Sequence, residues 1–232
     1  MRHTALVALT TVLLACGASS DTHINKNIRV GDGEHKKGSL RSVNGTINVG
    51  NEAMVDGNCT TVNGAINIGE NSRVGEVSCV NGSISIDRNS QAREVSCVNG
   101  SISLGGEVQI DGSVSTVNGS IHTKNETEIA GDIETVNGSI KVQETTIVGD
   151  LATVNGDIDL LEKSIVQGNI IVDRDNKKPK RNAYKELVIT IDAKSMVKGN
   201  IEVKGDDPHV KVILAGGGEV LGEIINAEVI RK

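Results

Sequence analysis

A Val-Asn-Gly triplet recurs seven times along this chain and constrains the fold more than any other feature. The spacings between successive asparagines are 19, 18, 18, 19, 19 and 18 residues. A fixed period in this range is the signature of a solenoid, in which each repeat forms one coil. We interpret the repeated asparagines as a structural turn of each coil. They are Asn44, Asn63, Asn81, Asn99, Asn118, Asn137 and Asn155.

Apolar residues occupy fixed columns around these asparagines. The third residue after Asn is isoleucine in every repeat, from Ile47 to Ile158. The fifth residue after Asn and the fourth residue before it are also mostly apolar, and a glycine usually stands six residues before it. Polar residues separate these columns, so each repeat alternates with period two, which indicates strands rather than helices.

Two alternatives to a parallel solenoid fit the repeat less well. A helical fold would place glycine and β-branched residues in every helix, at a high cost in stability. An antiparallel meander would use each Asn-Gly as a two-residue hairpin turn, but identical residues would not need to stack in it. In parallel coils, identical residues of successive coils lie directly above one another, about 4.8 Å apart. We therefore predict an all-β fold, a single-stranded parallel β-helix of about ten 18–19-residue coils, counted from Gly38 to Gly222.

Residues 1–15 have the pattern of a secretion signal, with a positive start and an apolar run too short to span a bilayer. The run ends in Leu-Leu-Ala-Cys-Gly at 13–17, which resembles the bacterial lipoprotein box. That resemblance implies cleavage before Cys16 and acylation of its thiol and new amino group, which would anchor the chain in a membrane. An ordinary signal peptide with an incidental cysteine is the alternative.

The residue after Cys16 bears on which membrane holds the anchor. It is Gly17 rather than the aspartate that retains lipoproteins in the inner membrane. The resemblance therefore favours the outer membrane of a Gram-negative bacterium. We predict a polar tether over residues 16–36 and the β-helix over residues 37–232.

Two insertions interrupt the period after the last Val-Asn-Gly. The longer insertion, residues 173–186, has a local charge of +3, and the shorter one lies around residues 205–209. Insertions in a solenoid become loops on one face, often the binding face. We predict a partner-binding loop that contains Lys177, Lys178, Lys180, Arg181 and Tyr184. Because an exposed strand edge must be covered or used for assembly, we predict a cap at residues 210–218.

The cysteines are placed for oxidation rather than for metal binding. Cys79 and Cys97 share one column on adjacent coils, which brings their Cα atoms within disulfide range in an oxidising compartment. Two free residues that merely pack are the alternative. Cys59 takes an aliphatic column, so we expect a buried free thiol. Because no Cys-X-X-Cys or Cys/His ligand spacing is present, no metal or cofactor is predicted.

Two columns admit both a structural and a functional interpretation. The asparagine column is expected to serve structure, with Asn and Gly adopting positive φ and stacked amides bonding between coils; a ligand-binding ladder is the alternative. The valine column just before each Asn is either a core column or, if the strands alternate strictly, an apolar stripe on the surface. We favour the core. Its members are Val43, Val62, Val80, Val98, Val117, Val136 and Val154.

Composition and motifs exclude several functions. Aromatic residues round to 0%, so stacking platforms for single-stranded nucleic acid are absent. A net charge of -6 also argues against general DNA binding. No nucleophile elbow, P-loop or nucleotide fingerprint occurs, and no column gathers acidic and arginine residues. We predict no catalytic residues; a polysaccharide-active enzyme is the remote alternative.

Two family resemblances complete the sequence evidence. The units Thr-Val-Asn-Gly-Ser-Ile at 135–140 and Thr-Val-Asn-Gly-Asp-Ile at 153–158 resemble the adhesin-like β-solenoid families of bacteria, including the head-GIN type. Val-X-Gly-X-Ile at 166–170 and 197–201 is similar to the coil pattern of bactofilins. The first resemblance is to families of unknown function that occur on secreted and lipid-anchored proteins and supply no catalytic residues. We predict a non-catalytic cell-envelope protein that binds an envelope polymer or a protein partner. The second implies a scaffold that assembles with itself, end to end or laterally.

Overall fold

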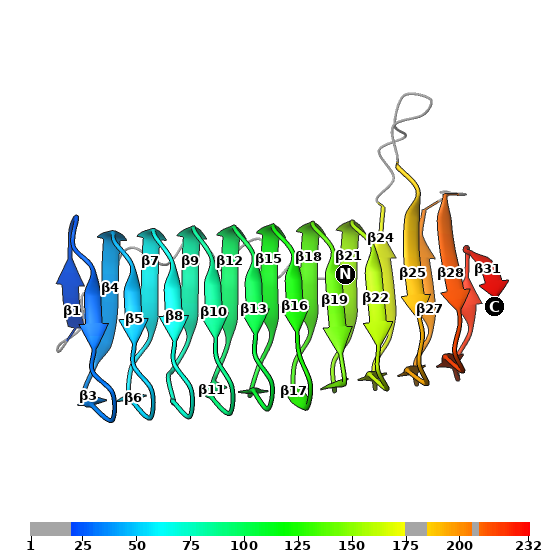
Figure 1. Ribbon diagram of the computed structural model, residues 1–232. Helices are drawn as coiled ribbons and strands as arrows, with labels where there is room; N and C mark the ends of the chain where they lie inside the picture. Colours follow the sequence, from blue (N-terminus) through cyan, green and yellow to red (C-terminus); the bar gives the residue numbers. More distant parts are fainter. Residues whose placement is uncertain (1–19, 175–184, 206–208) are drawn as a thin grey trace.

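The computed structural model describes residues 20–174, 185–205 and 209–232, which form a solenoid of stacked β-strands (Figure 1). Each strand pairs in parallel with the equivalent strand of the neighbouring coil; Ile84, for example, lies in register with Ile66 and Ile102. The described ranges hold no helix and no antiparallel pair. The predicted parallel β-helix is therefore confirmed, and the meander alternative is wrong.

Each coil passes through three faces. The first sheet consists of β1 (Ser20–His23), β4 (Ser39–Asn44), β7 (Cys59–Asn63), β9 (Val77–Asn81), β12 (Val95–Asn99), β15 (Val114–Asn118), β18 (Ile133–Asn137), β21 (Leu151–Asn155), β24 (Ile170–Asp173), β27 (Ile201–Lys204) and β30 (Ile224–Ile225). The second sheet consists of β2 (Ile28–Val30), β5 (Ile47–Val49), β8 (Ile66–Ile68), β10 (Ile84–Ile86), β13 (Ile102–Leu104), β16 (Ile121–Thr123), β19 (Ile140–Gln143), β22 (Ile158–Leu161), β25 (Leu187–Ile191), β28 (Val210–Leu214) and β31 (Glu228–Arg231). The narrow third face consists of the pair β3 (His35–Lys36) and β6 (Met54–Val55) and of β11 (Gln91–Ala92), β14 (Gln109–Ile110), β17 (Thr127–Ile129), β20 (Thr145–Ile147), β23 (Ile165–Val166), β26 (Met196–Val197) and β29 (Glu219–Val220).

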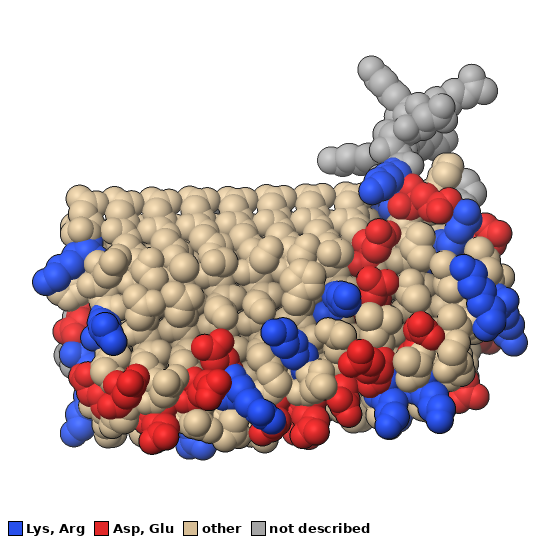
Figure 2. Space-filling view, viewed as in Figure 1, with Lys and Arg blue, Asp and Glu red and all other residues tan. Residues whose placement is uncertain are grey.

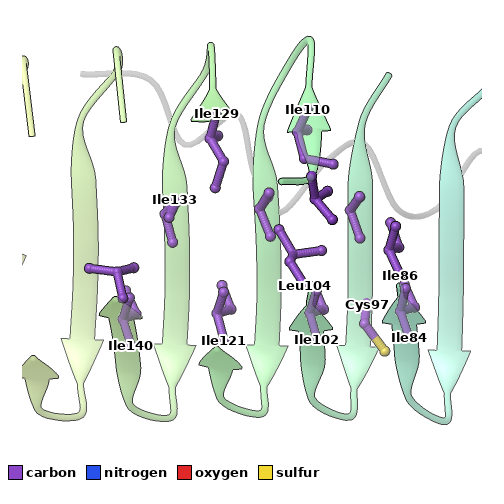
Figure 3. Packing of buried hydrophobic residues seen from close by; sticks show 14 of the residues in the cluster. Ile84, Ile86, Cys97, Ile102, Leu104, Ile110, Ile121, Ile129, Ile133 and Ile140 are labelled. Atoms are coloured by element: carbon purple, nitrogen blue, oxygen red, sulfur yellow. The ribbon is translucent and has the colours of Figure 1, made fainter. Parts of the chain in front are cut away.

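The core consists of apolar columns that run along the inside of the coils. The isoleucines of the unbroken column, Ile47 to Ile158, are at most 1% exposed, and Ile84, Ile102, Ile121 and Ile140 follow one another along the solenoid in Figure 3. Each such side chain contributes roughly 1.5–3 kcal/mol by leaving water. Aliphatic residues thus fill the narrow interior without any aromatic ring.

The solenoid begins earlier than predicted, so the tether boundary at residue 36 is wrong. Residues 20–36 form a complete first coil, in which β1 pairs with β4, β2 with β5, and β3 with β6. Ile28 and Val30 are buried in the same columns as Ile47 and Val49. This coil lacks the Val-Asn-Gly triplet and carries Ile24-Asn25-Lys26 in its place, which is why the repeat did not reveal it.

The Asn-Gly corner depends on close approach between coils rather than on positive φ. The seven repeated asparagines are not among the described residues with positive φ. A methyl group on Gly119 would collide with the carbonyl oxygen of Gly100 one coil earlier, and Gly82 and Gly138 are similarly crowded. Positive φ occurs instead at the opposite corner, where Glu52, Asn71, Asn89, Glu107 and Glu126 have φ between 54° and 59°. Our expectation of positive φ is therefore wrong for the asparagines, and among the corner glycines only Gly64, Gly100 and Gly156 have positive φ, at 153–159°.

Two boundaries near the C-terminal coils also differ from expectation. Asp173 belongs to β24 and pairs with Lys204, so the longer insertion begins after it. The predicted cap is wrong, because β28 is an ordinary strand that pairs with β25 on one side and with β31 on the other. Its sequence alternates inward and outward like the strands of the other coils.

We predict that Gly119→Ala lowers the free energy of unfolding by about 3 kcal/mol or more, because the backbone of two coils must move apart. The matched control is Gly31→Ala, whose new methyl group would meet only the flexible Glu34 carboxylate at 3.4 Å. Urea unfolding followed by circular dichroism measures both variants. Equal destabilisation by the two substitutions would contradict the role assigned to the corner.

Candidate interaction surface

The valine column faces outward, contrary to our expectation that it belongs to the core. In β7, β9, β12, β15, β18 and β21 the first four residues alternate between buried and partly exposed positions, and the Asn that follows is exposed. The position two before Asn is therefore buried and the valine next to it is partly exposed. The seven valines form a continuous apolar line on the outer surface of the first sheet, which we call the valine stripe.

The inward column next to the valines, two residues before each Asn, is occupied mostly by small polar side chains. The hydroxyls of Thr61, Thr116 and Thr135 donate hydrogen bonds to glycine carbonyl oxygens at the Asn-Gly corner of the preceding coil, at 2.9, 3.0 and 3.2 Å. Each hydrogen bond thus gives a partner both to the buried hydroxyl and to the glycine carbonyl oxygen. Cys79 and Cys97 take the same column in the two middle coils.

The two aligned cysteines form a disulfide between neighbouring coils, with their Cα atoms 4.6 Å apart. Both cysteines are 2% exposed. Cys59 is a buried free thiol, as expected, and burial raises its pKa to about 12. A thiol with so high a pKa carries almost no thiolate at neutral pH and is chemically inert.

The repeated asparagines form an exposed amide ladder along the corner between the first two sheets. Each Nδ2 group donates to the Oδ1 atom of the asparagine one coil earlier, over seven bonds of 2.5–3.1 Å that begin at Asn25 and end at Asn155. The predicted bonding between stacked amides is confirmed. We call this exposed line the asparagine edge.

The outer surface of the second sheet is neutral and polar next to this edge. Asn48 and Asn67 continue an amide ladder at 2.8 Å, and small serines follow in the next coils. We call this surface the polar face. It consists of Asn48, Asn67, Ser83, Ser85, Ser101 and Ser103.

Charge is absent from a broad band that includes most of the polar face and the middle of the asparagine edge. The four segments 59–68, 77–86, 95–104 and 114–123 contain no Lys, Arg, Asp or Glu, although each crosses the first sheet, the corner and the second sheet. Figure 2 shows this uncharged surface along the upper part of the solenoid, with the charges gathered toward the third face. The band can therefore contact a neutral partner without burying an unpaired charge.

A shallow hollow of about 180 Å³ lies on the outer surface of the first sheet, where the uncharged band ends. Its outward-facing lining consists of Ser115, Val117, Glu134, Val136, Ala152, Val154 and Asp173. Partial burial raises the pKa of Glu134, and the charges of Asp132 and Asp150 raise it further. The hollow thus joins an apolar stripe to two carboxyl groups, those of Glu134 and Asp173, and the pKa of the Glu134 carboxyl is raised.

We predict that Glu134→Gln stabilises the fold at pH 7 and that this gain disappears in acid. The folded chain binds the Glu134 proton more tightly than the unfolded chain, so stability rises as pH falls through the range between the raised pKa and the usual value of 4.5. Above that range wild type carries the full penalty, which glutamine removes. Urea midpoints of both chains at pH 7 and pH 4 measure the effect. A gain that persisted at pH 4 would contradict it.

Arg174 holds the base of the longer insertion. Its side chain is 4% exposed, and its guanidinium group donates to the carbonyl oxygens of Val154 at 3.3 Å and Lys185 at 3.0 Å. Both ends of the insertion therefore lie at the asparagine edge, where the ladder ends at Asn155. The predicted loop residues Lys177, Lys178, Lys180, Arg181 and Tyr184, and the predicted lipidation site Cys16, lie outside the described residues.

The comparisons add no functional assignment. No match was found among models of protein families, among curated proteins or among solved structures. Within residues 20–174, 185–205 and 209–232, no group of three or more His, Cys, Asp or Glu side chains is placed to hold a metal ion. The same ranges contain no helix that is long and apolar enough to cross a membrane.

Proposed function

We propose that this chain is a non-catalytic, lipid-anchored protein of the bacterial cell envelope with an adhesin-like, binding role. The observation that carries the proposal is the uncharged band, in which the polar face and the asparagine edge repeat the same neutral hydrogen-bonding groups from coil to coil. A long partner with repeating hydroxyl or amide groups can bond to several coils at once, and many weak contacts then add to useful avidity. We infer an envelope polymer with an uncharged glycan backbone as the ligand.

The location rests on two independent features. The Leu-Leu-Ala-Cys-Gly segment at 13–17 has the lipoprotein pattern, and Gly17 favours the outer membrane of a Gram-negative bacterium. The Cys79–Cys97 disulfide suits an oxidising compartment outside the cytoplasm. Both features support an envelope protein that displays its solenoid away from the lipid anchor.

We predict that Cys16→Ser abolishes incorporation of radiolabelled palmitate and releases the chain from the membrane fraction, because no other residue offers the acylated thiol. Cys59→Ser is the matched control and should retain the label, since Cys59 is buried in the core. Gel fluorography of membrane and soluble fractions gives the measurement. Label retained on the Cys16→Ser chain would contradict lipid anchoring at this residue.

We predict that the chain co-sediments with purified peptidoglycan sacculi and that Ser85→Lys/Ser103→Lys weakens this binding about tenfold, which equals a loss of about 1.4 kcal/mol. The two lysines would project from neighbouring coils of the polar face. Gln91→Lys/Gln109→Lys is the matched control, because these residues pair on the third face of the same two coils.

The outcomes separate the polar face from the basic loop. Wild-type binding to sacculi that only the polar-face variant loses supports the proposal. If deletion of residues 175–184 abolishes binding while the polar-face variant binds normally, the loop is the contact and the polar-face proposal is wrong. No binding by wild type would exclude this polymer as the ligand.

A further inference from the structure

The valine stripe is longer than the Val-Asn-Gly repeat indicates. Ile24 precedes Asn25 as each valine precedes its asparagine, and Ile24 is 70% exposed. The stripe therefore runs over eight consecutive coils, from Ile24 to Val154. It ends at β24 and β27, where Asp173 and Lys204 take the same column. An apolar line of this length on a surface marks a contact with another molecule.

A second outward column runs beside the stripe and carries a symmetric pattern of charge. Over the eight coils of the stripe, the strand registers align Thr22, Arg41, Thr60, Ser78, Ser96, Ser115, Glu134 and Ala152, and the column then continues to Ile171 and Glu202. Within the eight coils of the stripe, Arg41 and Glu134 are the only charged members among these described residues, and Glu202 lies two coils beyond the stripe. Arg41 on β4 and Glu134 on β18 lie equally far from the gap between β9 and β12, with two strands between each residue and that gap on either side.

We propose that two copies of this chain pack first sheet against first sheet, about a twofold axis that runs along the strands between β9 and β12. This axis places Val80 opposite the partner's Val98 and Ile24 opposite the partner's Val154. It also places Arg41 opposite the partner's Glu134, twice by symmetry. The two outward columns are thus self-complementary in both apolarity and charge, as an isologous interface requires.

The dimensions of the stripe indicate a weak dimer. Seven steps of about 4.8 Å give a length of about 34 Å, and a five-residue strand spans about 16 Å. The footprint is then about 500 Å² per copy, near the lower limit of specific interfaces. The polar face stays exposed in both copies, so this dimer does not rest on the proposed ligand and can fail independently of it.

A charge exchange tests this arrangement in the full chain carrying Cys16→Ser, by sedimentation equilibrium from about 1 to about 100 μM. We expect monomers and dimers without larger species. Arg41→Glu or Glu134→Arg alone should raise the dissociation constant about tenfold or more, because like charges then face each other twice. The double exchange should restore dimerisation. Because the double variant contains both substitutions, restored dimerisation would show that a folding defect does not explain the loss of dimerisation in the single variants.

A second pair of variants tests the apolar part of the interface. Val98→Lys should abolish the dimer, whereas Ser103→Lys, in the same coil on the polar face, should leave it intact. A monomer over the whole concentration range, open-ended growth, a dimer that tolerates Val98→Lys, or a double exchange that fails to restore association would each overturn the proposal.

Discussion

The spacing between coils, held around the whole perimeter of the solenoid, is the constraint on which the structure depends. Hydrogen bonds link successive coils at the Asn-Gly corner as they do within the sheets, for example from the Gly100 amide to the Asn118 carbonyl oxygen at 2.9 Å. The backbone can approach this closely at a corner only where no Cβ atom intervenes. Glycine at this column therefore keeps the coils in register, and the side chains then stack.

Stacking converts each position of the repeat into a line of identical chemistry. Isoleucine becomes a continuous core, asparagine becomes an amide ladder, and valine becomes an apolar stripe. Charged residues are the exception, because identical charges on neighbouring strands repel each other and destabilise the stack. Away from the band, opposite charges meet across coils, as in the ion pairs Arg88–Glu107 and Arg93–Glu76.

The two long sheets thus expose surfaces of different chemistry. In the middle coils, the second sheet and the asparagine edge present neutral donors and acceptors, which suit a repetitive hydrated polymer. Over its first eight coils, the first sheet presents an apolar stripe with one cation and one anion in the adjoining column, which suits a second copy of the same surface. One repeat unit supplies both surfaces, because successive residues of a strand point to opposite sides and the chain turns between the sheets.

The sequence by itself determined the parallel stacking, the inward isoleucines, the amide ladder and the buried Cys59, because each follows from identical residues recurring at one period. Only the tertiary structure decided the direction of the valines and the presence of the first coil. Valine, threonine and serine all fit a strand facing either way. The closed coil alone reveals that Thr116 reaches the Gly100 carbonyl oxygen at 3.0 Å, which makes the inside the better place for the hydroxyl and leaves Val117 on the surface.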